Sequence, residues 1–116
     1  MTPQHWTQTV HWHDAHVAAI AGDAAAGTLE FLLEIDATPY RLSFTGVLAL
    51  TAEPPLATLA WSEGFDGEIL GVRCVPEDSR RFRIRFSVQT FDYVAKRRAM
   101  LVIDGNVGEL RWEKVS

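Results

Sequence analysis

The most regular stretch of the chain reads RFRIRFSVQ, from Arg81 to Gln89. Every second residue in it is apolar, and the residues between are arginine, serine or glutamine. Side chains of a β-strand point alternately to its two faces, so this period of two predicts a strand with one buried and one solvent-facing side. We expect the buried side to comprise Phe82, Ile84, Phe86 and Val88.

Two earlier stretches of the chain share this alternation. We expect inward-facing positions at Leu29, Phe31, Leu33 and Ile35 in residues 28–36, and at Tyr40, Leu42, Phe44, Leu48 and Leu50 in residues 40–50. The turn-forming residues 36–39 lie between the two stretches and predict a hairpin. Leu32 is an apolar residue on the otherwise polar face of the first strand.

Further short strands are predicted at about residues 6–13, 17–21, 68–75, 99–103 and 107–112. The last two flank Asp104, Gly105 and Asn106, a sequence that favours a tight hairpin turn. Residues 15–26 and 91–100 also permit a short helix, because they contain alanine and a capping aspartate. Seven or eight short strands predict an all-β fold, an antiparallel sandwich or small barrel, formed by residues 1–116 as a single domain.

Composition narrows the classes of function. The formal net charge is −4, which argues against general nucleic-acid binding and makes a protein partner the better expectation. The single cysteine, Cys74, excludes an intrachain disulfide and suits a reducing compartment. The sequence lacks a signal peptide and an apolar run of membrane-spanning length, so we expect a cytoplasmic protein without membrane contact. Alanine and arginine usage suggests a bacterial source.

All four histidines lie within the first sixteen residues. If residues 6–13 form a strand, His11 and His13 project from the same face, as metal-ligand pairs often do. Asp14 or His16 would add a third ligand, which gives a candidate Zn²⁺ or Ni²⁺ site. We favour the other interpretation, in which these histidines are exposed polar residues and the protein has no cofactor.

Catalytic motifs are absent from the sequence: it contains no G-x-S-x-G elbow and no Gly-rich phosphate loop followed by Lys and Ser or Thr. This favours a non-catalytic binding or interaction module over an enzyme. The alternative is a small-ligand-binding β-barrel, whose cavity would be lined by aromatic residues such as Trp12, Trp61, Phe65, Tyr93 and Trp112.

The polar face of the strand at 81–89 carries Arg81, Arg83 and Arg85, which with Trp12 form the candidate surface for a ligand or partner. The interpretation that we favour for the three arginines is a solvated face matched by Glu30, Glu34 or Glu68 on neighbouring strands. A homodimer is also expected, because Leu32 interrupts a polar face and several strands lack the Lys or Pro residues that protect a sheet edge.

The segment from His13 and Asp14, through a hydrophobic strand and a glycine turn, to the Leu29-x-Phe31-x-Leu33-x-Ile35-Asp36 pattern resembles a group of small uncharacterised bacterial β proteins. Some of these look like immunity proteins of toxin systems. The resemblance covers about the first third of the chain and implies no catalytic residues.

Overall fold

The computed structural model describes residues 5–6, 12, 15–53, 65–78, 80–92 and 96–115. Its elements are β1 (His16–Asp23), β2 (Thr28–Ile35), β3 (Thr38–Thr45), β4 (Leu48–Glu53), β5 (Phe65–Pro76), β6 (Phe82–Asp92), β7 (Arg97–Val107) and β8 (Glu109–Lys114). All of them belong to one antiparallel sheet in the order β4-β7-β6-β5-β1-β2-β3-β8. The predicted all-β antiparallel fold is confirmed.

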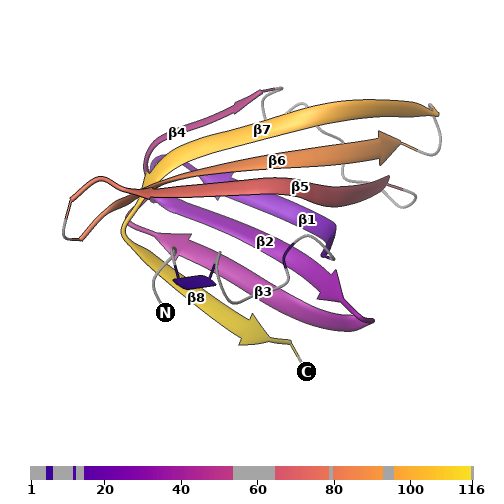
Figure 1. Ribbon diagram of the computed structural model, residues 1–116, viewed down its shortest axis with the longest axis horizontal. Helices are drawn as coiled ribbons and strands as arrows, with labels where there is room; N and C mark the ends of the chain where they lie inside the picture. The colour runs from indigo at the N-terminus through magenta and orange to yellow at the C-terminus, as the bar shows by residue number, and fades with distance from the viewer. Residues whose placement is uncertain are drawn as a thin grey trace.

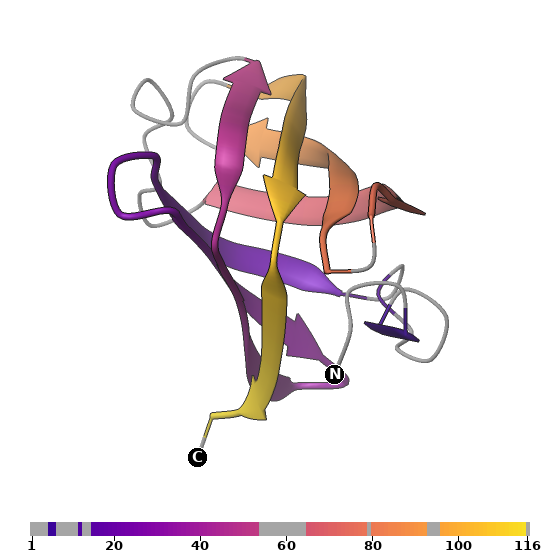
Figure 2. The ribbon, with the colours of Figure 1, turned by 90° about the vertical axis from the view of Figure 1, so that its left-hand side faces the viewer.

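The sheet is strongly twisted and folds over on itself (Figure 1). Strands β4, β7, β6 and β5 form one half, and β1, β2, β3 and β8 form the other. Figure 2 shows why the halves stay together: β3 runs on into β4, and β7 runs on into β8, so that two long bent strands cross from one half to the other. The sheet is not closed, because β4 and β8 remain at its ends, and the arrangement is that of a sandwich.

Aromatic side chains fill the space between the two halves. Phe86 from β6 lies with its ring centroid 4.6 Å from that of Phe31 on β2 and 5.8 Å from that of Phe44 on β3. Trp6, which precedes the first strand, is fully buried and lies 6.1 Å from Phe86 and 5.7 Å from Trp112 on β8. The core thus joins residues of both halves and of the N-terminal segment.

The alternation predicts the buried face correctly for β2, β3 and β6. Phe31, Phe44 and Phe86 are buried, as are Leu29, Leu33, Leu42, Ile84 and Val88. Ile35, Tyr40 and Phe82, at the ends of the same strands, are only partly buried. The hairpin at residues 36–39 is confirmed as well. Asp36 and Ala37 both have positive φ, as the central residues of a two-residue hairpin turn require.

Three predictions about elements are wrong. The described residues of the expected strand at 6–13, Trp6 and Trp12, belong to no strand. Residues 40–50 form two strands rather than one, because the chain bends at Gly46, whose φ is +64°. This bend shifts the alternation, so that Val47 is buried and Leu48, expected in the core, is 57% exposed.

The third error is the hairpin at Asp104, Gly105 and Asn106. These residues lie within β7, and none of them has the positive φ of a tight turn. The chain instead continues through Gly108 into β8, which pairs with β3 and not with β7. The helical alternatives are also wrong for the residues described: residues 16–23 form β1, and 91–92 and 97–100 belong to β6 and β7.

Candidate functional site

The outer surface of β5, β6, β7 and β4 is built from rows of directly opposed residues. The strand registers define these rows as Val75–Arg83–Asn106–Leu48, Arg73–Arg85–Asp104–Thr51 and Gly71–Ser87–Val102–Glu53. The residues between them on β6, Ile84 and Phe86, point into the core. We call this outer surface, together with Leu70, Arg81 and Met100 at its borders, the arginine face.

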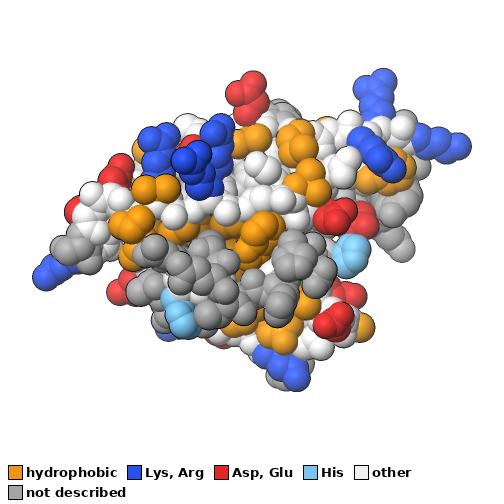
Figure 3. Space-filling model, in the orientation of Figure 1, with side chains coloured by type: hydrophobic (Ala, Val, Ile, Leu, Met, Phe, Trp, Pro, Cys, Tyr) orange, Lys and Arg blue, Asp and Glu red, His pale blue; other side chains and the backbone are white. Residues whose placement is uncertain are grey.

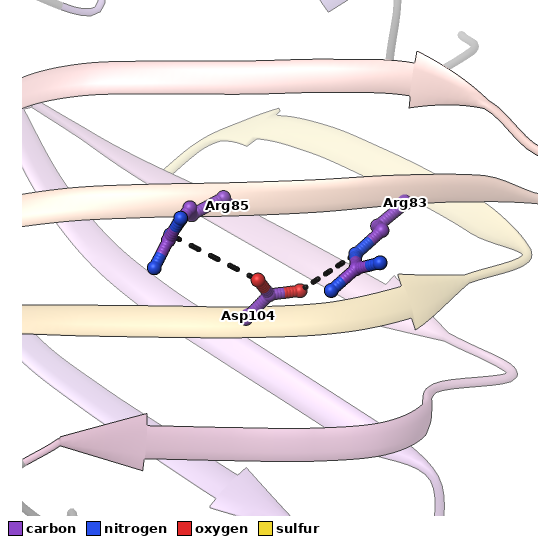
Figure 4. A network of polar contacts seen from close by, with 3 residues as sticks. All are labelled: Arg83, Arg85 and Asp104. Atoms are coloured by element: carbon purple, nitrogen blue, oxygen red, sulfur yellow. Dashed lines mark hydrogen bonds and ion pairs between the residues drawn. The ribbon is translucent and has the colours of Figure 1, made fainter.

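Asp104 holds two arginines of this face in place. Its Oδ1 lies 3.3 Å from Nε of Arg83, and its Oδ2 lies 3.8 Å from Nε of Arg85. Figure 4 shows the carboxylate on β7 between the two guanidinium groups from β6. Both contacts with Asp104 involve the Nε atoms, and the side chains of Arg83 and Arg85 are 66% and 57% exposed. They are available to an external carboxylate.

Positive charge on the arginine face is only partly neutralised. Arg73 on β5 lies directly opposite Arg85 on β6, an arrangement of like charges that destabilises a sheet. The three rows and Arg81 together have four arginines and two carboxylates, Asp104 and Glu53, an excess of two positive charges. Glu68, which lies in the row of Met100 through Gln89, reduces this excess to one. This local excess contrasts with the net charge of −4 for the chain.

The exposed large hydrophobic residues of the described chain lie on the same half of the sheet. They are Leu48 (57% exposed), Leu70 (47%), Val75 (46%) and Met100 (48%), on β4, β5 and β7. Figure 3 shows a group of basic side chains with hydrophobic side chains around it on this half. Arginine and methionine are enriched in protein interfaces. Single apolar residues scattered over a surface do not indicate an interface, whereas a group of exposed apolar residues does.

Arg81, Arg83 and Arg85 form the arginine stripe. Arg81 differs from the other two because it is half-buried and forms hydrogen bonds with other segments of the chain. Its Nε donates a hydrogen bond to Oδ1 of Asn106, and its Nη2 donates to the backbone oxygen of Gly46. A longer contact of 3.4 Å joins Nη2 to the backbone oxygen of Asn106. Arg81 therefore supports the bend between the two sheet halves.

The carboxylates expected to match the arginine stripe are elsewhere. Glu30 lies on β2 and pairs with Arg41 on β3, at 3.4 Å between Oε1 and Nε, while Glu34 lies on the same strand. Glu68 lies opposite Gln89 at the other end of β5. The counter-ion of Arg83 and Arg85 is Asp104. Sequence patterns do not identify it, because they assign residues 104–106 to a turn rather than to a strand. Extending the alternation of Leu101, Ile103 and Val107 through these residues would have revealed it.

The candidate metal site falls largely outside the described residues, which include neither His11, His13 nor Asp14. His16 opens β1, is exposed, and its Nδ1 lies 3.5 Å from Oδ1 of Asp66. It lines an open depression of about 420 Å³. Within the described part of the chain, no group of three His, Cys, Asp or Glu side chains is placed to hold a metal ion.

The aromatic residues considered for a ligand cavity are distributed differently. Trp12 and Trp112 are half-buried and pack against the core, and Trp112 stacks on Tyr40 with ring centroids 4.7 Å apart. Trp61, Tyr93 and the side chain of Phe65 lie outside the described part of the structure. Trp12 and Trp112 therefore contribute to the packing of the hydrophobic core.

Cys74 on β5 is half-buried, and burial raises the pKa of its thiol from 9.0 to about 11. The thiolate is the reactive form, so we expect iodoacetamide to label the folded protein about a hundredfold more slowly than the urea-unfolded chain near neutral pH. The same shift adds a contribution to the stability of the folded state. This contribution is fully present below pH 9 and is lost as the pH rises from 9 to about 11. Equal labelling rates for the folded and the unfolded protein would contradict the raised pKa of Cys74. The Cys74→Ser variant controls for labelling at other residues.

Comparisons of this chain with protein-family models, with curated proteins and with solved structures find no match. No helix in the described residues is long and apolar enough to cross a membrane.

Proposed function

We propose that this protein is a non-catalytic protein-binding module and that its partner docks on the arginine face. The observation that carries this proposal is a coincidence on one surface. The incompletely neutralised arginines and the exposed large hydrophobic residues of the described chain occupy the same half of the sheet. Arginine anchors beside apolar contacts are typical of the residues that dominate binding energy at protein interfaces.

The charges of the face indicate the chemistry of the partner. The terminal nitrogens of Arg83 and Arg85 offer parallel donors that match a carboxylate, and a carboxylate placed near Arg73 and Arg85 would relieve their mutual repulsion. An acidic protein surface with apolar residues supplies both kinds of contact. A nucleic acid is the weaker candidate, because the chain has a net charge of −4 and the face contains carboxylates of its own, Glu53, Glu68 and Asp104.

A partner of this kind agrees with the resemblance to immunity-like proteins, whose partners are protein toxins. We also propose a cytoplasmic location, which the single cysteine supports because the chain can form no intrachain disulfide.

The test is to capture partners from an extract of the source cell, purify the main one and measure its affinity. We expect the Arg73→Glu/Arg85→Glu variant to bind at least tenfold more weakly, because hot-spot arginines contribute about 2 kcal/mol or more each. Affinity for the unaltered protein should also fall as salt is added.

The matched control is Lys96→Glu/Arg97→Glu, which changes the net charge equally. Both residues are exposed at the turn between β6 and β7, away from the arginine face. Equal affinity of the partner for the protein and for the Arg73→Glu/Arg85→Glu variant would show that the arginine face is not the binding site.

A further inference from the structure

Strand β8 is an edge of the sheet, and its geometry is more regular than that of the other edge. Its six residues pair with β3 in one continuous register, from Tyr40 opposite Lys114 to Thr45 opposite Glu109. In the described part of the chain, no strand pairs with the outer side of β8. The opposite edge, β4, contains a register shift between Leu48 and Thr51, and such bulges protect an edge from pairing.

The hydrogen bonds to β3 determine which backbone groups of β8 remain free. The N–H of Val115 donates to the carbonyl of Pro39 at 2.9 Å, and these two residues are direct partners in the continued register. Along an antiparallel ladder the bonded residues alternate, so Glu109, Arg111 and Glu113 direct their backbone groups toward β3. Leu110, Trp112 and Lys114 therefore direct theirs toward the open edge.

The side chains on the outer face of β8 form an alternating charge pattern of Glu109, Arg111 and Glu113. We propose that β8 pairs antiparallel with β8 of a second copy of this chain, about a two-fold axis at Trp112. This register matches the free backbone groups, because Trp112 faces itself and Leu110 faces Lys114 as hydrogen-bonded pairs. It also places Arg111 opposite the partner subunit's Glu113, twice across the axis.

Charge excludes the neighbouring register. An axis at Arg111 places that residue opposite its own copy and Glu109 opposite the partner subunit's Glu113, so that every pair on the outer face repels. An axis at Leu110 restores opposite charges, but it moves Trp112 opposite Gly108, where the strand bends into β7. The axis at Trp112 is the register that satisfies both the charges and the straight part of the strand.

This interface lies on a different half of the sheet from the arginine face. It is carried by the edge geometry and charge pattern of β8 alone, so it stands or falls independently of the proposed function. Pairing through β8 joins the two sheets into one and leaves the arginine face of each copy exposed.

The test uses Arg111→Glu and Glu113→Arg separately and as an equimolar mixture. Sedimentation velocity over a concentration series should show that the unaltered protein forms a dimer and that each variant alone associates at least tenfold more weakly, because both charge pairs become repulsive. In the mixture, each pair across the axis again has opposite charges, so we expect a mixed dimer with the affinity of the unaltered protein.

Mixing separates this interface from an effect on folding. Within one chain, Nε of Arg111 lies 3.5 Å from Oε1 of Glu113. Each substitution breaks this intrachain ion pair, and mixing the two variants does not restore it. Recovery on mixing therefore reports contacts between chains, while circular dichroism checks the fold of each variant. An unaltered protein that is monomeric throughout, variants that dimerise normally, or a mixture that does not recover would each overturn the proposal. Arg97→Glu, outside both surfaces, should dimerise normally.

Discussion

Replacing Phe86 by alanine should lower the free energy of unfolding by about 3–5 kcal/mol, the usual cost of truncating a buried aromatic residue. Phe86 is fully buried on β6, and its ring contacts Phe31, Phe44 and Trp6. These neighbours come from β2, β3 and the N-terminal segment, so the cavity would open where the two sheet halves meet. Since small domains are stable by about 5–15 kcal/mol, this loss is a large part of the total.

Urea denaturation followed by tryptophan fluorescence measures this change. The control is Val75→Ala, which removes apolar atoms from a residue of the neighbouring strand β5 that is 46% exposed. We expect its free energy of unfolding to change by no more than about 1 kcal/mol. A loss below 1 kcal/mol for Phe86→Ala would show that the halves are not held together by this aromatic cluster.

The second large effect is expected at Arg81. Its replacement by alanine should destabilise the protein by about 1.5–3 kcal/mol, as for hydrogen bonds formed by a charged group. The guanidinium group bonds to Gly46, at the bend between β3 and β4, and to Asn106, near the bend between β7 and β8. Without it, both acceptors lose their protein partner at the point where the chain changes sheet halves.

The comparison for Arg81→Ala is Arg83→Ala, two residues further along the chain on the exposed face of β6. Arg83 is 66% exposed and its guanidinium group forms an exposed ion pair with Asp104, so its removal should cost at most about 1 kcal/mol. Denaturation curves for the two variants, together with hydrogen exchange at β4 and β8, test the difference. Equal losses for the two variants would contradict a special role for Arg81 at the bend.

Two of the three arginines of the stripe, Arg81 and Arg83, illustrate what alternation can predict about the candidate site. In the structure Arg83 lies on the exposed face of β6, whereas Arg81 lies one residue before β6 and is half-buried. The period of two places both arginines on one solvent-facing surface of a strand. It does not distinguish their roles, because Arg81 meets Gly46 from a segment 35 residues away and Arg83 meets Asp104 from another strand. Such contacts depend on strand order, which short-range patterns do not encode.

Leu48 and Asp104 show where short-range patterns mislead. Leu48 continues the phase of β3 in the sequence, but the bend at Gly46 inserts a shift and turns its side chain outward. Asp104 belongs to a sequence with strong turn propensity, yet it remains in an extended strand because β4 and β6 pair on either side. Pairing with two neighbours overrides local turn preference.

The sequence by itself determined that the chain forms an antiparallel β fold, and which residues of β2, β3 and β6 are buried. It could do so because the two-residue period and the hairpin turn at residues 36–39 are properties of adjacent residues. Only the tertiary structure decided that β3–β4 and β7–β8 are bent pairs crossing between the sheet halves, and that the exposed apolar residues gather around the arginines. Both features arise from the order and register in which distant strands pair, and long-range packing rather than local conformation selects these.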